Sequence, residues 1–253
     1  MSRLQGLNVM VTGAASGFGR GIAEAMAREG AAVLVTDVNA DGAAQVAEGI
    51  TTQGGRAEAM VVDITDPDSL AAGVARAEAA FGSLSTMVAN AGIGQRPARA
   101  SETPAAEMRR QVEMNAIGPA LTCQTAIPAL RRHGDGASII LTVSAIALTP
   151  RPEFCAYGMA KSAAGYFLKS LALDLAPEGI RVNGLFPAVS DTPMFEEFSD
   201  GDMGKAPAFG AAMPLGRLVK PEDVGAAAVY LASPTEAGIL TGCALPVDAG
   251  RTI

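Results

Sequence analysis

The chain has 253 residues, 49% of them hydrophobic, so it is long and apolar enough for one large domain (1–253) with a sizeable core. Its net charge of −7 and its lack of any basic block argue against a nucleic acid partner. It has no apolar run of about 18 residues and no signal-peptide layout at its start, so we expect a cytoplasmic protein without a membrane span.

Apolar, β-branched runs alternate with alanine-rich helical patterns along the chain. The runs predict strands at 7–13, 31–38, 57–65, 84–92, 137–145, 180–188 and 243–250. The helical patterns predict helices at 18–29, 40–53, 67–81, 104–132, 157–176 and 221–232. Most strand runs are continuously apolar, as expected for strands covered on both faces. We therefore expect an α/β fold, a single-domain Rossmann-type doubly wound parallel sheet of seven strands with helices on both faces.

A glycine-rich segment, "TGAASGFG", follows the first predicted strand and contains Gly13, Gly17 and Gly19. Such a segment makes a tight turn, brings bare backbone close to a pyrophosphate, and leads into a helix N-terminus whose N–H groups attract anions. The spacing is G-x-x-x-G-x-G rather than the commoner G-x-G-x-x-G, and an ordinary strand–helix turn is the alternative. Its position between the first strand and the first helix favours a dinucleotide site.

An acidic residue, Asp37, ends the second predicted strand, 18 residues after Gly19. A carboxylate there can accept hydrogen bonds from both adenosine ribose hydroxyls and would repel a 2′-phosphate. Neither the glycine segment nor "TDVNAD" contains Arg or Lys, so NAD is favoured over NADP. The alternative is a surface Asp that caps the next helix. Asp63 and Asn90 end the third and fourth strands, where Asp63 can reach the adenine ring and Asn90 can bridge neighbouring loops.

Tyr157 and Lys161 stand four residues apart in "CAYGMAK", and Ser144 ends the preceding strand. Residues four apart share one helix face, so both side chains can point at one spot. A nearby ammonium favours the phenolate and lowers a tyrosine pKa that is ordinarily about 10. Tyr157 could then accept a proton from an alcohol while hydride leaves the carbon, with Ser144 orienting the oxygen.

These motifs make the chain similar to the classical short-chain dehydrogenase/reductase family over essentially its whole length. The glycine segment resembles the family's cofactor loop, "NAG" at 90–92 its strand-stabilising motif, and "YGMAK" with Ser144 its catalytic residues. "NAIG" at 115–118 resembles the segment with the catalytic asparagine, and "PAVSDTPM" at 187–194 the segment that holds the nicotinamide carboxamide. Ala188 and Ala249 depart from this resemblance, because the family usually has glycine at both places.

The resemblance implies a role for each matching residue. Tyr157 would be the acid–base, Lys161 would bind the nicotinamide ribose and lower the Tyr157 pKa, and Ser144 would position the substrate oxygen. Asn115 would hold a water molecule that links Lys161 to solvent, and Thr192 would hold the carboxamide. The expected cofactor contacts are Gly13, Ser16, Gly17, Phe18, Gly19, Asp37, Val38, Asp63, Ile64, Asn90, Ala91, Gly92, Tyr157, Lys161, Pro187, Val189 and Thr192.

One long irregular region, 189–219, interrupts the alternation of strands and helices. A loop of that length in a compact domain is usually functional, so we expect a substrate lid, with a disordered insertion as the alternative. The expected substrate contacts are Ser144, Ala145, Ile146, Phe154, Tyr157, Met194 and Phe195. This mostly apolar set favours a substrate with a hydrophobic body, and Glu153, Glu196 and Glu197 are expected to face water rather than sugar hydroxyls.

Three functional interpretations fit the sequence. The leading one is an oxidoreductase that transfers hydride between NAD(H) and a secondary alcohol or ketone. The enzyme alternative is an NADPH-dependent 3-oxoacyl-carrier-protein reductase, which is disfavoured because no basic residue occurs near Ser16 or Val38. The third is a cofactor-binding regulator on a degenerate scaffold, which would be expected to lack Tyr157, Lys161 or Ser144.

The remaining expectations concern assembly, thiols and metals. The predicted helix 157–176 is apolar over most of its circumference, so a second subunit is expected on one side, and the resemblance implies a homotetramer. Cys123, Cys155 and Cys243 are far apart and fit buried thiols better than disulfides or a metal site. The one histidine, His133, is expected at a helix end without a catalytic role.

Overall fold

Seven parallel strands form one sheet in the order β3-β2-β1-β4-β5-β6-β7. This computed structural model describes residues 2–190 and 192–253, so Met1 and Asp191, which is part of the predicted lid, lie outside the described residues. The strands are β1 (Asn8–Thr12), β2 (Ala32–Asp37), β3 (Arg56–Val61), β4 (Thr86–Ala89), β5 (Ser138–Thr142), β6 (Arg181–Pro187) and β7 (Ala244–Val247). The predicted doubly wound, seven-stranded sheet is confirmed.

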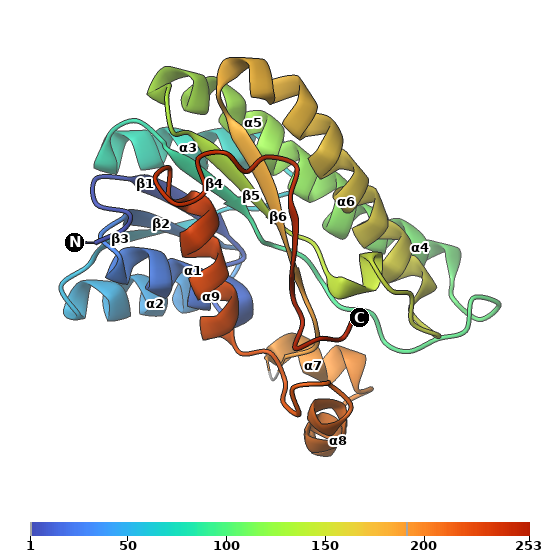
Figure 1. Cartoon of the computed structure of the whole chain (residues 1–253). Coiled ribbons are helices and arrows are strands. Elements are labelled where there is room, and N and C mark those ends of the chain that lie inside the picture. The colour runs from blue at the N-terminus through green and yellow to red at the C-terminus, as the bar shows by residue number, and fades with distance from the viewer. Residues whose placement is uncertain (1, 191) are drawn as a thin grey trace.

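Helices pack on both faces of this sheet (Figure 1). They are α1 (Gly17–Arg28), α2 (Ala40–Thr52), α3 (Pro67–Phe81), α4 (Ala105–Val112), α5 (Gly118–His133), α6 (Cys155–Leu175), α7 (Pro193–Phe198), α8 (Ala206–Ala211) and α9 (Pro221–Ala232). Short 3-10 turns occupy Ala145–Ala147, Ala176–Glu178 and Met203–Lys205, and a π-helix occupies Glu113–Ile117. His133 ends α5, as the sequence predicts.

Alternate residues of each central strand are buried in two different hydrophobic cores. In β1, Val9 and Val11 lie in the core that contains Ile22 of α1 and residues of α2 and α9. Met10, between them, lies in the opposite core with Leu168 of α6 and residues of α3 and α5. Because both faces are covered, the strand sequences are apolar throughout instead of alternating with polar residues.

The helix predicted over 104–132 is divided in the structure. A π-helix, Glu113–Ile117, separates α4 from α5. Such a widened turn inserts one extra residue per turn and is frequent at functional sites. Asn115 lies within it and bonds the backbone of Ile93, which follows β4, so a long-range contact favours the interruption. The apolar period on either side gives no sign of it in the sequence.

The lid segment, residues 189–219, is more regular than the sequence suggests, because it contains α7, a 3-10 turn and α8. Both short helices carry a proline in the first turn, where the missing N–H has no intrahelical acceptor to lose. The segment closes at its base, where the Val219 N–H donates to the Val189 carbonyl over 3.1 Å. The Leu215 N–H donates to the Ala249 carbonyl over 3.1 Å, so the chain's C-terminal residues lie beside the lid (Figure 1).

The prediction of three buried thiols is wrong for Cys155, which is exposed because it is the first residue of α6 and faces outward. Cys243 is half-buried, and Cys123 is buried.

Over residues 2–190 and 192–253, no helix is both long and apolar enough to cross a bilayer. Within the same residues, no three His, Cys, Asp or Glu side chains gather in a way that would hold a metal ion.

Candidate active site

A cavity of about 720 Å³ lies at the carboxyl ends of the central strands, where strand order reverses between β1 and β4. One end lies beside Asp37 and Asp63, and the other lies beside α6 and the lid. Its lining includes every expected cofactor contact: Gly13, Ser16, Gly17, Phe18, Gly19, Asp37, Val38, Asp63, Ile64, Asn90, Ala91, Gly92, Tyr157, Lys161, Pro187, Val189 and Thr192. The topology thus gathers residues from the whole length of the chain along one channel.

The glycine segment leaves no room for side chains. A Cβ on Gly19 would lie 2.1 Å from the Gly13 carbonyl oxygen, so α1 approaches the end of β1 as closely as backbone permits. Gly13 has φ of +63°, and a Cβ there would lie 2.6 Å from Ala91 Cα. Ser16, at the start of α1, makes no side-chain capping bond, so its hydroxyl does not occupy the first N–H groups of that helix. This cradle of bare backbone and helix N-terminus fits a pyrophosphate.

Asp37 is held at the end of β2 beside that cradle. Its Oδ2 accepts from the Ala15 N–H over 3.0 Å, and its Oδ1 accepts from the Asn39 N–H over 2.9 Å. Asn39, not Asp37, caps α2, because its side chain accepts from the Gly42 N–H. The helix-cap alternative for Asp37 therefore does not hold, and the carboxylate remains available to a ligand in the cavity.

Asn90 ties the ends of two strands together. Its Nδ2 donates to the carbonyl oxygens of Thr12 and Gly13 over 3.0 and 3.1 Å. The Thr12 hydroxyl in turn accepts from the backbone N–H groups of Asn90 and Ala91. These bonds fix the glycine cradle against β4.

Tyr157, Lys161 and Ser144 converge on the cavity from two elements. Tyr157 and Lys161 lie one turn apart on α6 and are 6% and 3% exposed, so both polar groups are nearly removed from water. The Lys161 Nζ donates to the Thr142 carbonyl at the end of β5 over 3.1 Å and lies 5.8 Å from the centre of the Tyr157 ring. Tyr157 and Ser144, which are expected to act on the substrate oxygen, and Lys161, which is expected to act on Tyr157, therefore line one cavity.

Burial determines how the two ionisable groups titrate. It raises the pKa of Tyr157 to about 12, against the opposing effect of a hydrogen bond from Ser144, and the Glu197 charge raises it further. Burial also lowers the pKa of Lys161 to about 8. The expected lowering of the Tyr157 pKa by Lys161 is not found in this arrangement, because desolvation of the phenolate outweighs any attraction to an ammonium turned toward Thr142.

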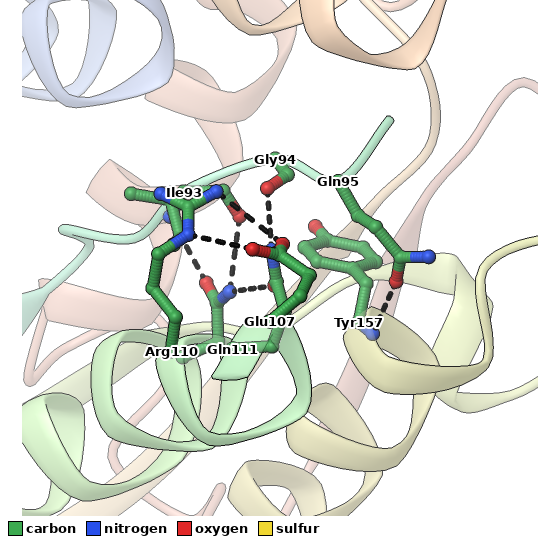
Figure 2. Close-up of polar contacts among 8 residues, drawn as sticks. Ile93, Gly94, Gln95, Glu107, Arg110, Gln111 and Tyr157 are labelled. Carbon is green, nitrogen blue, oxygen red and sulfur yellow. Dashed lines mark hydrogen bonds and ion pairs between the residues drawn. The ribbon is translucent and has the colours of Figure 1, made fainter. Parts of the chain in front are cut away.

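Asn115 lies behind the cavity wall and is not part of the lining. It is fully buried in the π-helix, where its Oδ1 accepts from the Ile93 N–H over 3.1 Å. Its Nδ2 donates to the Ile93 carbonyl over 3.0 Å and to Gln111 Oε1 over 2.7 Å. Gln111 Nε2 donates to the Gly94 carbonyl over 2.6 Å and to Glu107, so α4 is bonded to the irregular segment that follows β4 (Figure 2).

Gln95 is a residue that the sequence analysis missed. Its Oε1 accepts from the backbone N–H of Tyr157 over 2.8 Å (Figure 2). Its Nε2 donates to the Glu153 carbonyl over 3.1 Å. Phe154, at the N-cap position of α6, makes no side-chain capping bond, so Gln95 supplies one from a distant segment. A contact 62 residues apart leaves no local signal in the sequence.

The substrate end of the cavity agrees with most of the expected contacts. Ser144, Ala145, Ile146, Phe154 and Met194 line it, together with Tyr157. Phe195 does not, because it points into the protein, is fully buried, and packs edge-on against Phe209. Phe198 takes its place one helical turn later, with its ring 5.3 Å from that of Tyr157. The expectation for Phe195 is therefore corrected to Phe198.

The three glutamates of this region do not line the cavity. Glu153 and Glu196 are exposed, whereas Glu197 is half-buried and lies near Gly94.

The two alanines that depart from the family pattern differ in setting. Ala188 lines the cavity, and Ala249 has φ of +53°, in the left-handed region where glycine is ordinarily preferred.

Comparisons with known proteins agree with this geometry. A family model described as enoyl-(acyl carrier protein) reductase matches residues 13–252. Cis-4-hydroxycyclohexanecarboxylate dehydrogenase of Sinomonas cyclohexanicum is 39% identical, over 96% of this chain and 95% of its own. A 4-formylbenzenesulfonate dehydrogenase of Comamonas testosteroni is 37% identical, over 96% of this chain and 97% of its own. The crystal structure of 3-ketoacyl-(acyl-carrier-protein) reductase from Brucella melitensis complexed with NADH has 36% sequence identity and a TM-score of 0.90. The match covers 99% of this chain and 100% of the other.

Proposed function

The chain belongs to the short-chain dehydrogenase/reductase family and is an oxidoreductase acting on CH–OH groups, and from this we propose that it interconverts a ring-borne secondary alcohol and its ketone with NAD(H). The observation that carries the proposal is the convergence of Ser144, Tyr157 and Lys161 on a cavity whose other end presents Asp37. Acid–base groups and a dinucleotide cradle in one channel are what hydride transfer to or from an alcohol needs.

The roles of the side chains follow from their positions. When bound, the nicotinamide supplies the hydride acceptor or donor. Tyr157 takes the proton from the alcohol oxygen, and Ser144, whose hydrogen bond favours the phenolate, holds that oxygen. Lys161 is buried beside Tyr157, and its ammonium would stabilise the phenolate once its Nζ turns from Thr142 toward the ring. Asn115 lies behind them, with both Nδ2 hydrogens donated to Ile93 and Gln111, so a water molecule held by its side chain would have to share Oδ1 with the Ile93 N–H.

The residues present fit a nicotinamide dinucleotide on physical grounds. The Gly19 cradle accepts bare phosphate oxygens, and the buried hydroxyls of Thr142 and Ser190, both in the cavity wall, have no hydrogen-bond partner in the described structure. A buried hydroxyl without a partner costs free energy that a bound ligand can recover. Pro187, Val189 and Thr192 flank Ser190, so this is the expected position for the nicotinamide carboxamide.

We propose NAD rather than NADP because of Asp37. The basic residues in the described cavity wall, Arg151, Lys161 and Arg251, lie beside α6 and the C-terminal segment and not beside Asp37. A 2′-phosphate would therefore meet a carboxylate with no cation near it.

A six-membered ring as the substrate body has two supports. The Sinomonas relative is named for a hydroxycyclohexane substrate. The cavity wall around Tyr157 is apolar and aromatic, with Ile146, Phe154 and Phe198. Such a wall excludes water and binds a hydrocarbon ring through its area. The lid segment, which supplies Phe198 and Met194, would cover the ring.

Steady-state assays test this function. Cyclohexanol, 4-methylcyclohexanol, open-chain secondary alcohols, polyols and 3-hydroxyacyl thioesters would each be assayed with NAD and with NADP. We expect ring alcohols with NAD to give the highest kcat/KM. If the purified protein binds NADH yet oxidises no alcohol of the panel, and reduces none of the matching ketones, the proposed reaction is wrong.

A 3-oxoacyl-carrier-protein reductase is the second candidate, because a solved structure named as a 3-ketoacyl-(acyl-carrier-protein) reductase covers 99% of the chain. The same site would perform that reduction with the same residues. The assay separates the two, because an acyl-carrier reductase must prefer acetoacetyl thioesters over cyclohexanone, whereas the proposed enzyme must not. The net charge of −7 makes the chain a poor match for an acidic carrier protein.

We also propose a homotetramer in the cytoplasm. Met159, Tyr166 and Leu173 on α6 are 50%, 76% and 78% exposed, and Ile117 adds to this apolar surface. A second copy would cover these side chains. Light scattering should give about four times the 25.6 kDa of one chain, and a mass of one chain would contradict the tetramer. A reducing compartment suits the exposed Cys155 thiol, and cell fractionation tests the location.

A further inference from the structure

Two arginines line the substrate end of the cavity, whose wall there is mostly apolar. Arg151 precedes Phe154 in the segment between β5 and α6, and Arg251 lies in the C-terminal segment beside the lid. The proposed chemistry at Tyr157 uses neither of them. A positive charge in a half-buried apolar cavity costs free energy, so its presence needs a reason.

Arg151 is held in a fixed orientation by aromatic rings. Its guanidinium carbon lies 4.7 Å from the ring centre of Phe154 and 4.7 Å from that of Phe209 in α8. Stacking of this kind uses the flat faces of the guanidinium and leaves its N–H edge available. That edge presents parallel donors whose spacing matches the two oxygens of a carboxylate.

The charges around Arg151 favour an anion. Burial lowers the pKa of Arg151, and the nearby positive charge of Arg251 lowers it further, while Glu153 acts in the opposite direction. Within residues 2–190 and 192–253, neither arginine has a carboxylate within ion-pair distance. Two cations that repel each other in one wall are both stabilised when an anion binds between them.

A series of aromatic contacts connects Arg151 with Tyr157. The Phe198 ring lies 5.3 Å from the Tyr157 ring and 5.7 Å from the Phe154 ring, centre to centre. Phe198 thus contacts both of these rings, and Phe154 in turn lies against Arg151. A ring substrate whose hydroxyl meets Tyr157 would lie against these phenyl rings and direct its far side toward the guanidinium.

We propose that the substrate carries a single anionic substituent, a carboxylate or sulfonate, which Arg151 and Arg251 bind while the ring hydroxyl lies at Tyr157. This specificity rests on the proposed function, because it names the substrate of the same site. It makes the far end of the cavity a recognition site, with charge-assisted hydrogen bonds that a neutral ring alcohol cannot form.

A structural role for Arg151 would look different in experiment. The stack on Phe154 and Phe209 joins the segment after β5 to α8, so Arg151 also holds the lid. Loss of that contact alone would lower activity toward charged and neutral substrates by the same factor. Loss of anion recognition would lower activity toward charged substrates only.

The experiment compares cis-4-hydroxycyclohexanecarboxylate with its methyl ester, with NAD, in the wild type and three variants. The wild type should prefer the acid over the ester in kcat/KM by tenfold or more, as expected for hydrogen bonds to a charged group. Arg151→Gln and Arg251→Gln should each reduce that preference by about tenfold, mainly through KM of the acid. Arg28→Gln, at an exposed arginine outside the cavity wall, is the matched control and should keep the preference.

Equal use of acid and ester by the wild type, or equal loss of both in Arg151→Gln and Arg251→Gln, would overturn the anion site while leaving the alcohol dehydrogenase function intact. No turnover of acid, ester or neutral ring alcohols would overturn the proposed function instead. In that case, calorimetry with cyclohexanecarboxylate and cyclohexanecarboxamide still decides. Binding of the acid alone, lost in Arg251→Gln, supports the anion site, and equal or absent binding of the two refutes it.

Discussion

Asn115 donates a 2.7 Å hydrogen bond from its Nδ2 to the Oε1 of Gln111, and both side chains are fully buried. The two residues lie on either side of the junction between α4 and the π-helix. Asn115 also bonds both backbone groups of Ile93, and Gln111 bonds the Gly94 carbonyl (Figure 2). The pair therefore fixes the interrupted helix to the segment after β4, directly behind Lys161, whose Nζ would lie 3.3 Å from a Cβ on Gly92.

Replacing Gln111 with methionine should affect both stability and turnover. The Gln111→Met variant leaves the Asn115 amide and the Gly94 carbonyl without their partner, at about 1–3 kcal/mol for each buried group. We expect a Tm lower by several degrees, measured by calorimetry, and kcat lower by about tenfold, because Asn115 loses one of its constraints. Gln45→Met, on the exposed face of α2, is the control. An unchanged kcat together with a lowered Tm would limit Gln111 to a structural role.

Replacing Tyr157 with phenylalanine should abolish the chemistry and spare the fold. The Tyr157→Phe variant keeps the ring, its contact with Phe198 and the backbone bond to Gln95, and loses only the hydroxyl that hydrogen-bonds Ser144. Turnover should fall by about 10²–10⁴-fold, which is the usual contribution of a general acid–base group. NADH fluorescence should show cofactor binding close to that of the wild type. Turnover within tenfold of the wild type would assign the proton to another group.

Lys161 should lower the free energy of unfolding of the unliganded protein below about pH 8. Burial lowers its pKa from an ordinary 10.5 to about 8, so the unfolded chain binds this proton between those values and the folded chain does not. Lys161 therefore does not lower the free energy of unfolding above pH 10.5, where it is neutral in both states. It lowers that free energy progressively as the pH falls from 10.5 to about 8, because the unfolded chain takes up the proton first. Lys161→Met should therefore stabilise the protein at pH 7 by up to about 3 kcal/mol, less the lost bond to Thr142.

The measurement is urea unfolding of wild type and Lys161→Met between pH 7 and 10. The difference in unfolding free energy should shrink as pH rises, and activity should be lost at every pH. Lys169→Met, on the exposed face of the same helix, should show no such trend. A gain in stability that is constant with pH would mean that Lys161 does not titrate differently in the folded state.

The strands of the parallel sheet and the cofactor cradle were predictable because local chemistry determines them. Continuous apolar runs predict buried parallel strands, and the glycines around Gly19 lie where the backbone of α1 meets Gly13. Asp37 was found for the same reason, since it ends a strand. The π-helix was not predictable, because the cause of the interruption is a bond between Asn115 and Ile93, 22 residues away.

The substrate end was predicted less well, because it depends on contacts between distant segments. Phe195 and Phe198 lie on the same short helix, and only the packing of Phe195 against Phe209 determines which of them faces the cavity. The setting of Arg151 was not predictable, because only one of the two rings that hold it, Phe154, is near in sequence, and the other, Phe209 of α8, is 58 residues away. A cluster of rare aromatic residues in the lid, in a chain with only 8 phenylalanines, was the one available hint.

Removing the charge of Asp37 should relax the choice of cofactor. Asp37→Asn keeps a side-chain oxygen that can accept from Ala15 or Asn39 but removes the negative charge that would face a 2′-phosphate. The ratio of kcat/KM for NAD to that for NADP should fall by about tenfold or more, with most of the change in KM, because a like charge nearby costs on the order of 1–4 kcal/mol in a partly solvated site. Asp41→Asn, at an exposed carboxylate in the first turn of α2, is the matched control and should leave the ratio unchanged. A wild type that uses both cofactors equally, or an Asp37→Asn variant with the wild-type ratio, would show that this carboxylate does not choose the cofactor.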